Sequence, residues 1–505
     1  MQIVQGELWK TIKLFIIPVI IEIIIFCIFI KIGRDTSKES KIAKAKTRII
    51  LISVSLIVLL ILFLPIQLLN KFMKSKVFDI ENRNDYAGFT SISQYYLTYG
   101  IIGGIYGEML ENRLIEPDNY NEDIINKALL NVKENENKTL GKPNIIVVFS
   151  ESFWDIDQLD EVEFNTKVTP NFNDLKNKGL FFNMITPSYG GISSNVEYEF
   201  LTGSNTMFFN HSYIPYMQLY RNGTYYNRPS IIMELKNNGY KTKIATCASP
   251  ELFNCGRFYK YLQVDEVEYI TNVEEKNIKG KYVSDEYITD KIIDKLNNKD
   301  KNEKMFYMTM TMQAHMPYPK DKYSSYDVWV IKSNFSNEVN DTLTSYAQGI
   351  YDADKQLGRL YEYIQKLDEP TIIVFYGDHL PYLYSGRVNA IDILKYFNTS
   401  NKTLNTYRKY NTQSLIIANF GLDTDKEKTK YLGPDLLSAY ILNNMDINIS
   451  NYYKWLYESR KDIGSANFLV TVDNNGNLYN TYELSGKQKN IYELRKNIEY
   501  KLFVK

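Results

Sequence analysis

Thr-Ile-Ile-Val-Phe-Tyr-Gly-Asp-His-Leu, at residues 371–380, is the stretch of sequence that decides the fold. Its first six residues are mostly apolar, with β-branched and aromatic side chains, which predicts a strand buried on both faces, as in a parallel sheet. Gly377 ends this strand, and Asp378 and His379 follow directly. Ligands of open α/β sheets bind just beyond the carboxyl ends of strands, and a carboxylate beside an imidazole is a metal-ligand pair by chemical type. A polar turn without a ligand is the alternative, because Asp is common in turns.

Two further buried-strand patterns also end in side chains suited to catalysis. Residues 144–149 precede Glu151, and residues 305–312 precede His315. Only three histidines occur in the chain, and two of them follow strands. Strand patterns alternate with helical ones, which predicts βα units around a largely parallel sheet. Because the carboxyl ends of parallel strands meet at one edge, we expect these groups to converge with the Asp378–His379 pair. The remaining segments are predicted strands at residues 179–184 and 240–246, and predicted helices at residues 170–175, 230–238 and 344–367.

A glycine-rich segment at residues 189–203 reads Tyr-Gly-Gly-Ile-Ser-Ser-Asn-Val-Glu-Tyr-Glu-Phe-Leu-Thr-Gly. Glycines permit close approach of the backbone to a ligand. Ser194 and Glu197 have the spacing of a capping box, which predicts that a helix begins here. A helix N-terminus attracts phosphate, and Ser193 lies at its mouth, where an alkoxide could be stabilised. The alternative is that both serines serve only to cap the helix.

The N-terminal part of the chain has two apolar segments, at residues 12–30 and 49–69. Each is close to the ~20 residues that span a bilayer, and buried core helices are the alternative. The loop between them is rich in Lys and Arg, so the positive-inside rule places it in the cytoplasm and residues 79–505 outside. We therefore expect a transmembrane helical hairpin at residues 1–77 and a membrane-proximal helical linker at residues 78–142.

The composition of the chain limits the classes of protein and partner to consider. The chain has 59 basic and 59 acidic residues, which gives no reason to expect a nucleic acid or another polyanion as a partner. Its aromatic content of 14% excludes a disordered chain. Of the three cysteines, Cys27 lies in an apolar segment, while Cys247 and Cys255 are either a free pair or a disulfide. Near the C-terminus, residues 467–479 have the pattern of a β-hairpin.

Four motifs in order carry a resemblance to a known family: Ser-Glu-Ser at residues 150–152, the glycine-rich segment, Gln-Ala-His-Met-Pro-Tyr at residues 313–318, and Tyr-Gly-Asp-His-Leu at residues 376–380. Together they resemble the lipoteichoic acid synthase family of the alkaline phosphatase and sulfatase superfamily. The resemblance implies an α/β fold with a mostly parallel sheet flanked by helices. It also implies a sulfatase-like extracytoplasmic catalytic domain at residues 143–446, with residues 447–505 as a C-terminal extension that completes it. The implied localisation is a multi-pass protein of the cell membrane.

The activity implied by the resemblance is transfer of glycerol phosphate from phosphatidylglycerol. Mn²⁺ is the implied cation, with Mg²⁺ and Zn²⁺ as alternatives. By position, Glu151, Ser193, Asp378 and His379 would hold this metal. Ser193 stands where the family usually has a threonine nucleophile, and a serine provides the same hydroxyl. The acceptor would be a glycolipid, a growing polymer or a polysaccharide of the cell envelope.

The resemblance to the family is less complete at the residues that would bind the substrate than at those that would bind the metal. His315 would contact the substrate phosphate. The family's substrate-binding arginine falls on Cys255 here, and Arg257, two residues later, is the predicted substitute. The alternatives are a phosphoethanolamine transferase, a phosphodiesterase, a sulfatase and an inactive envelope scaffold. The sulfatase nucleophile motif is missing after Ser193, and the intact set of site residues argues against a scaffold.

Overall fold

The computed structural model describes residues 114, 116–209, 213–220, 228–386, 388–423 and 429–505. The chain divides into two units, residues 1–85 and residues 86–505, and all described residues belong to the second. The predicted transmembrane hairpin and most of the predicted linker therefore lie outside the described residues. Within the described part of the chain, no helix combines the length and the apolar character that crossing a membrane requires.

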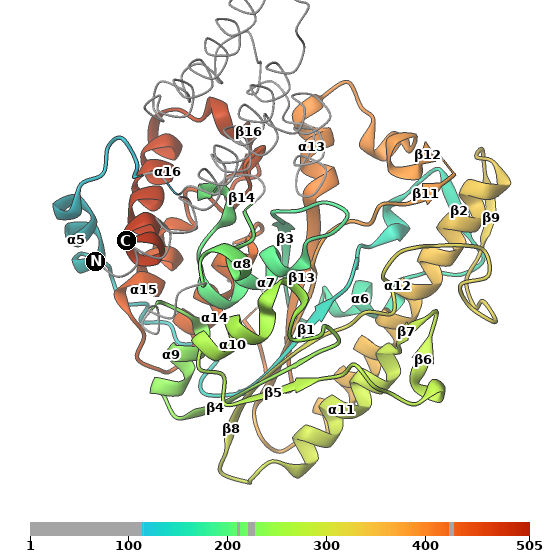
Figure 1. Ribbon diagram of the computed structural model, residues 1–505, viewed down its shortest axis with the longest axis horizontal. Coiled ribbons are helices and arrows are strands. Elements are labelled where there is room, and N and C mark those ends of the chain that lie inside the picture. The colour runs from blue at the N-terminus through green and yellow to red at the C-terminus, as the bar shows by residue number, and fades with distance from the viewer. Residues whose placement is uncertain (1–113, 115, 210–212, 221–227, 387, 424–428) are drawn as a thin grey trace, which may run out of the picture. The chain divides into compact units, whose positions relative to one another are not determined.

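A seven-stranded sheet forms the centre of the described unit (Figure 1). The strand order is β3-β13-β10-β1-β8-β4-β5, and every neighbouring pair from β10 to β5 is parallel. Only β13 runs against the others, because it is antiparallel to both β10 and β3. The strands in this order are Leu180–Ile185, Asn411–Ala418, Thr371–Gly377, Asn144–Ser150, Lys304–Met310, Tyr240–Thr246 and Glu266–Tyr269. The predicted mostly parallel α/β sheet is thus confirmed.

The central strands β1 and β10 are buried along their whole length, as their continuous apolar sequences predict. They pair in parallel from Asn144 opposite Thr371 to Ser150 opposite Gly377. This register brings both carboxyl ends to the same level of the sheet. The residues that follow the two strands therefore start from adjacent positions at one edge.

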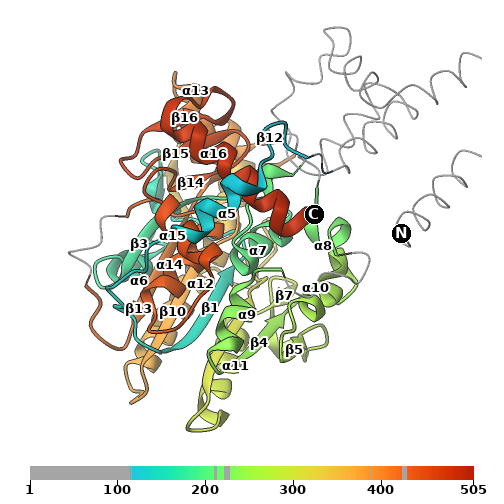
Figure 2. The same ribbon diagram turned by 90° about the vertical axis from the view of Figure 1, so that its left-hand side faces the viewer.

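Helices cover both faces of the sheet and enclose two hydrophobic cores (Figures 1 and 2). One core takes side chains from α7, α9, α10, α14 and α15, and the other from α6, α11 and α12. The first group is Ser193–Thr202, Ile231–Asn237, Cys255–Tyr261, Pro434–Asn444 and Asn451–Ser459. The second group is Pro170–Leu175, Asp285–Asn298 and Asn337–Ile364. The predicted helix at residues 344–367 corresponds to α12, which begins seven residues earlier.

The C-terminal region adds a helix and a small sheet to this unit. Helix α16 (Gly486–Glu499) lies beside α5 (Glu122–Leu130) in both views (Figures 1 and 2), and Lys501 just after it donates to Asn126 at 2.6 Å. The predicted hairpin at residues 467–479 is confirmed as antiparallel strands β15 (Val470–Val472) and β16 (Leu478–Asn480). Strand β14 (Ser465–Ala466) joins β15. The other α-helices of the described residues are α8 (Pro215–Gln218) and α13 (Lys402–Tyr410). The other strands form the antiparallel pairs β2 (Val162–Phe164) with β9 (Val330–Ser333), β6 (Ile278–Lys279) with β7 (Tyr282–Val283), and β11 (Tyr384–Ser385) with β12 (Val388–Asn389).

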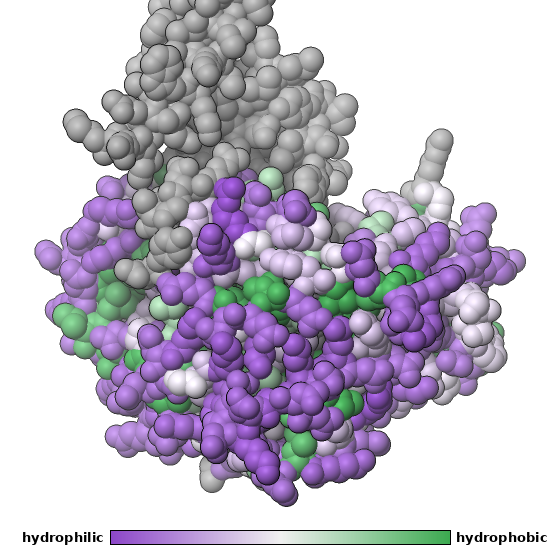
Figure 3. All heavy atoms as spheres, turned by 60° about the horizontal axis from the view of Figure 1, so that its bottom comes forward, coloured by the Kyte–Doolittle hydropathy of each residue, from purple (hydrophilic) through white to green (hydrophobic). Residues whose placement is uncertain are grey.

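The face of the described residues that Figure 3 presents is mostly hydrophilic. Hydrophobic residues appear there as separate groups between polar side chains. Scattered apolar residues are normal on a protein surface and indicate no particular partner. The functional argument therefore rests on the edge of the sheet.

Candidate active site

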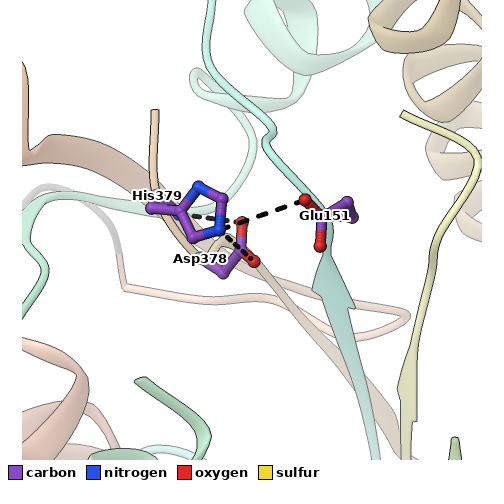
Figure 4. A group of neighbouring side chains, drawn as sticks. All are labelled: Glu151, Asp378 and His379. Carbon is purple, nitrogen blue, oxygen red and sulfur yellow. Dashed lines mark hydrogen bonds and ion pairs between the residues drawn. The ribbon is translucent and has the colours of Figure 1, made fainter. Parts of the chain in front are cut away.

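Glu151, Asp378 and His379 meet at the carboxyl edge of the sheet (Figure 4). Glu151 follows β1, while Asp378 and His379 follow the neighbouring strand β10. All three side chains are buried, and one potential ligand atom from each lies within 4.8 Å of the others. The grouping predicted from the strand ends is therefore present.

Ser152 joins the two carboxylates of this cluster. Its backbone N–H donates to Asp378 Oδ1 at 2.6 Å, and its hydroxyl donates to Glu151 Oε1 at 2.8 Å. Ser152 has φ 54°, a left-handed conformation that is uncommon for residues other than glycine and is enriched at functional sites. Sequence reasoning assigned no role to Ser152, although its position next to Glu151 was a signal that could have suggested one.

The electrostatics of the cluster favour a bound cation. Burial raises the pKa of Glu151 well above its ordinary value, and the neighbouring Asp378 raises it further. Glu151 Oε2 is buried without a hydrogen-bond partner. Among the described residues, no Lys or Arg forms an ion pair with either carboxylate. Two buried acids and an orphaned oxygen fit a divalent cation, because a cation would replace the proton that burial favours on Glu151 and neutralise the carboxylates.

His379 is oriented as metal-binding histidines usually are. Its Nδ1 lies 3.1 Å from the Leu380 carbonyl oxygen, so Nδ1 carries the proton. Its Nε2 lies on the side of the carboxylates, 3.3 Å from Asp378 Oδ2 and 4.0 Å from Glu151 Oε1. Oxygen and imidazole ligands together suit Mn²⁺ and Zn²⁺, and carboxylate oxygens also suit Mg²⁺.

The Ser193 hydroxyl lies against this cluster. It donates to Asp378 Oδ2 at 2.7 Å and lies 3.4 Å from His379 Nε2. Ser193 is the first residue of α7, so the free N–H groups and the dipole of the helix favour an anion beside it. The residue before it, Ile192, has φ 62° and ψ 45°, which is a strained conformation for a β-branched side chain. The site thus places a hydroxyl, two acids and a helix N-terminus together.

The predicted capping box of Ser194 and Glu197 is wrong. The N-cap of α7 is Ile192, which makes no side-chain cap bond, so Ser194 is already the second residue of the helix. The Ser194 hydroxyl is buried and has no partner. Glu197 instead accepts a hydrogen bond from the Tyr259 hydroxyl at 2.7 Å. The left-handed turn at Ile192 starts the helix two residues earlier than the serine pattern predicts.

His315 lies in the loop after β8 and is half-buried. Its Nδ1 lies 2.7 Å from the Met316 carbonyl oxygen and 3.0 Å from the Tyr282 hydroxyl. Burial lowers the pKa of His315, while the nearby Asp378 carboxylate raises it. The role of His315 at the substrate phosphate stays a prediction.

The position of the family arginine and its predicted substitute differ in exposure. Cys255, at the position of the family arginine, is buried, and its thiol lies 3.2 Å from the Ser249 carbonyl oxygen. Arg257 is exposed on α10, and its role in substrate binding stays a prediction. Cys247 and Cys255 are both free thiols.

Comparison with known proteins gives a family match and a partial match to one relative. Residues 143–433 match the profile of the sulfatase family. A relative from Rhizobium meliloti (strain 1021), provisionally named a cyclic beta-1,2-glucan modification protein, is 32% identical over 241 residues. The match covers 48% of this chain and spans 36% of that relative's length.

Two solved structures are similar in fold. The phosphoglycerol transferase GacH of Streptococcus pyogenes, in complex with sn-glycerol-1-phosphate, has a TM-score of 0.60 at 23% identity, over 77% of this chain and 96% of that one. The lipoteichoic acid synthase LtaP of Listeria monocytogenes has a TM-score of 0.54 at 20% identity, over 75% and 96%. The family profile confirms the sulfatase relationship predicted from the motifs, and the two solved structures agree with the predicted fold.

Proposed function

Because the chain belongs to the sulfatase family, we propose that it is a metal-dependent transferase that moves glycerol phosphate from phosphatidylglycerol to a hydroxyl group of a cell-envelope glycan or glycolipid. The observation that carries this proposal is the contact of the Ser193 hydroxyl with Asp378 at 2.7 Å, at the edge of the buried metal-type cluster. The fold shared with a phosphoglycerol transferase supports the donor. The relative named for glucan modification supports a carbohydrate acceptor.

Glu151, Asp378 and His379, with the Ser193 oxygen, are the proposed metal-binding residues. A divalent cation bound there would supply positive charge to the phosphate oxygens and lower the pKa of the Ser193 hydroxyl. Mn²⁺ is the proposed cation, and Mg²⁺ and Zn²⁺ are the alternatives. The protein itself contributes the orientation of these groups, through Ser152 and the neighbouring strands β1 and β10.

The first half of the reaction forms a covalent intermediate. The Ser193 oxygen attacks the phosphorus, and the bond from phosphorus to the diacylglycerol oxygen breaks. Asp378 Oδ2 orients the attacking hydroxyl by accepting its hydrogen bond. The proton of the hydroxyl ends on the released diacylglycerol, so a glycerophospho-serine remains. The free N–H groups at the start of α7 can hold the phosphate oxygens.

The second half restores the enzyme. A hydroxyl group of the acceptor attacks the phosphoserine, the bond between phosphorus and the Ser193 oxygen breaks, and the acceptor proton returns to that oxygen. His315 is the proposed contact at the phosphate, where its ring can accept a hydrogen bond from the reacting hydroxyl group. In these two half-reactions, Ser193 and His315 are the proposed catalytic residues. Arg257 is the proposed contact for the headgroup.

A lipid donor requires access to a membrane. The apolar segments at residues 12–30 and 49–69 are the proposed anchor, with the catalytic unit on the extracytoplasmic side. A single cysteine engineered into the basic loop at residues 31–48 should resist an impermeant thiol reagent in intact cells. Labelling of that loop would contradict the proposed topology.

Mass spectrometry after brief exposure to lipid tests the proposed reaction. The full chain is incubated with Mn²⁺ and vesicles of phosphatidylglycerol, and parallel samples receive phosphatidylethanolamine. We expect a glycerophospho adduct on the peptide that contains Ser193, and its loss in Ser193→Ala. An ethanolamine phosphate adduct would make the protein a phosphoethanolamine transferase instead. An adduct on Ser194, or normal turnover by Ser193→Ala, would refute the nucleophile.

A further inference from the structure

The loop at residues 313–316, which carries His315, is held at four successive carbonyl groups. Each carbonyl oxygen accepts a hydrogen bond from a side chain outside the loop. The pairs are Tyr323 with Gln313 at 3.3 Å, Tyr318 with Ala314 at 2.8 Å, Lys322 with His315 at 2.6 Å, and Tyr282 with Met316 at 2.6 Å. Loop carbonyls on a protein surface commonly bond to water instead. The backbone that carries His315 is therefore fixed by the protein.

Tyr282 acts on the imidazole ring as well as on the loop. Its hydroxyl lies 3.0 Å from His315 Nδ1 and donates to the Met316 carbonyl oxygen, which is itself 2.7 Å from Nδ1. A carbonyl oxygen can only accept, so Nδ1 carries the proton in this arrangement. His315 Nε2 then keeps its lone pair.

Lys322 is an unusual residue for the interior. Its side chain is 5% exposed, although lysine is almost never fully buried without a partner. Its ammonium donates to the His315 carbonyl oxygen and lies near the rings of Tyr282, Tyr318 and Tyr323, at 5.6, 4.8 and 5.4 Å from their centroids. Burial lowers the pKa of Lys322 to about 8, which still leaves it protonated and able to donate at pH 7.

The hairpin of β6 and β7 presents Tyr282 to the loop. Gly280 and Lys281 both have positive φ, at 60° and 76°, as a two-residue hairpin turn of the primed type requires. A Cβ atom on Gly280 would lie 2.6 Å from the Tyr323 ring and 3.0 Å from the Lys322 side chain. The hairpin thus packs directly on two of the tethering residues. An ion pair of 2.7 Å between Lys279 and Asp352 fixes it to α12.

We propose that Tyr282 and Lys322 are positioning residues that hold His315 as the Nδ1–H tautomer, which leaves the Nε2 lone pair for the hydroxyl group that reacts at phosphorus. The proposal deepens the proposed function, because it identifies what orients the histidine of that site. In this tautomer, Nε2 accepts a hydrogen bond from a hydroxyl group of the substrate. Sequence spacing gave no indication of either residue.

Nitrogen NMR of the full chain labelled with ¹⁵N-histidine tests the tautomer without any substrate. The sequence has only three histidines, and His315→Gln identifies the signals of His315. We expect His315 to show a protonated Nδ1 and an unprotonated Nε2. We expect Tyr282→Phe and Lys322→Met to give a mixture of both tautomers. Wild-type protein with its proton on Nε2 would overturn the proposal.

Kinetics provides the second measurement, with matched controls. Tyr282→Phe and Lys322→Met should each lower kcat by about 10–100-fold and change KM by less than about 3-fold, because a misplaced group mainly affects the transition state. The controls are Tyr363→Phe, which removes an exposed bond to Asn297, and Lys320→Met, which removes an exposed ion pair with Asp341. Both should match the wild type in kcat and in the His315 tautomer.

The two measurements separate the failure of this inference from the failure of the proposed function. If the protein does not act on phosphatidylglycerol but His315 shows the expected tautomer and responds to both variants, only the donor is wrong. If both variants match their controls in tautomer and kcat, the positioning role is refuted. Should Lys322→Met not fold, Tyr282→Phe decides the question, since it keeps the aromatic ring.

Discussion

Helix α7 connects two clusters of buried acidic residues whose charges are compensated differently. At its N-terminus, Ser193 contacts the cluster of Glu151, Asp378 and His379. Near its C-terminus, Glu199 belongs to a second cluster, in which burial and the neighbouring Asp435 raise the pKa of Glu199 well above its ordinary value. Both clusters lie in the interior, so burial alone does not distinguish them.

The second cluster has its own cation. Arg495 is buried, donates to Glu499 at 2.8 Å and lies 2.5 Å from Asp435 Oδ2. The other Glu499 oxygen accepts from the Ser204 hydroxyl at 2.7 Å and from the Asn205 N–H at 2.9 Å. These bonds link α16 to the end of α7 and to α14, so the role of the cluster is structural.

Among the described residues, no Lys or Arg forms an ion pair with the first cluster, and the charge of Lys322 only partly lowers the pKa of Glu151. Within the described part of the chain, only Glu151, Asp378 and His379 place three potential metal ligands so close together. Each cluster holds a carboxylate oxygen without a hydrogen bond, Glu151 Oε2 in the first and Glu199 Oε2 in the second, but no Arg or Lys in the described residues forms an ion pair with Glu151. The difference teaches that a buried acid indicates a metal site only where the protein does not neutralise the acid itself.

The largest expected effect is at Ser193. Ser193→Ala should lower transferase activity by at least about 1,000-fold, since it removes the nucleophile at the first cluster. Ser193→Thr should keep activity, because threonine offers the same hydroxyl. Steady-state release of diacylglycerol measures both variants. An alanine variant within about 10-fold of the wild type would show that the covalent step lies elsewhere.

Arg495→Met should produce the next largest effect, on stability. It leaves Asp435 and Glu499 without their cation, and breaking a buried ion pair costs about 3–5 kcal/mol. Arg359→Met is the control, because its ion pair with Asp290 is exposed and should contribute less than about 1 kcal/mol. Urea unfolding of both variants gives the free energies. Equal losses would mean that the second cluster does not depend on Arg495.

Glu197, between the two clusters on α7, shows a third way to compensate a buried acid, by retaining a proton. Burial raises the pKa of Glu197 to about 7 in the folded protein. The folded state then binds the proton more tightly than the unfolded state, so this stabilisation is complete below about pH 4.5 and is lost as pH rises through 7. Glu197→Gln should flatten the decline in unfolding free energy between pH 5 and 7, by up to about 1.4 kcal/mol per pH unit. Parallel curves for the two proteins would disprove the shift.

Ser194→Ala should have the smallest effect, below about 0.5 kcal/mol. Ser194 makes no cap bond, and its buried hydroxyl has no partner, so the substitution removes no interaction. Loss of a capping residue would instead cost about 1 kcal/mol. Thermal unfolding distinguishes the two values and tests the corrected start of α7.

The sequence predicted the central sheet and the metal-type cluster because each is encoded locally. The continuous apolar runs of β1 and β10 identify buried strands, and Glu151 and Asp378 follow them directly. The antiparallel direction of β13 was not predicted, because no local pattern indicates the direction of a strand relative to its neighbour. The resemblance to a known family, rather than the strand pattern, assigned the nucleophile to Ser193.

Two features were not predicted, the residues that hold His315 and the start of α7, because both depend on contacts made only in the folded chain. Lys322 and Tyr282 lie seven and 33 residues from His315, and only the folded loop and hairpin bring them to it. The start of α7 was misplaced because Ile192 adopts a left-handed conformation that its side chain disfavours. Neither feature has a signature in local spacing, since tertiary packing determines both.

The metal content of matched variants tests the central claim most directly. The full chain, Asp378→Asn and Glu199→Gln are purified identically, and divalent metal per folded chain is measured by elemental mass spectrometry. Glu199→Gln changes a buried acid of the second cluster on α7, the helix that begins at Ser193, and Thr206 donates to its carboxylate twice, at 2.8 and 2.7 Å. We predict about one cation per chain in the wild type and in Glu199→Gln, and at least about a 10-fold loss in Asp378→Asn. Full occupancy in Asp378→Asn, or equal loss in both variants, would contradict the assignment of the metal site to the edge of the sheet.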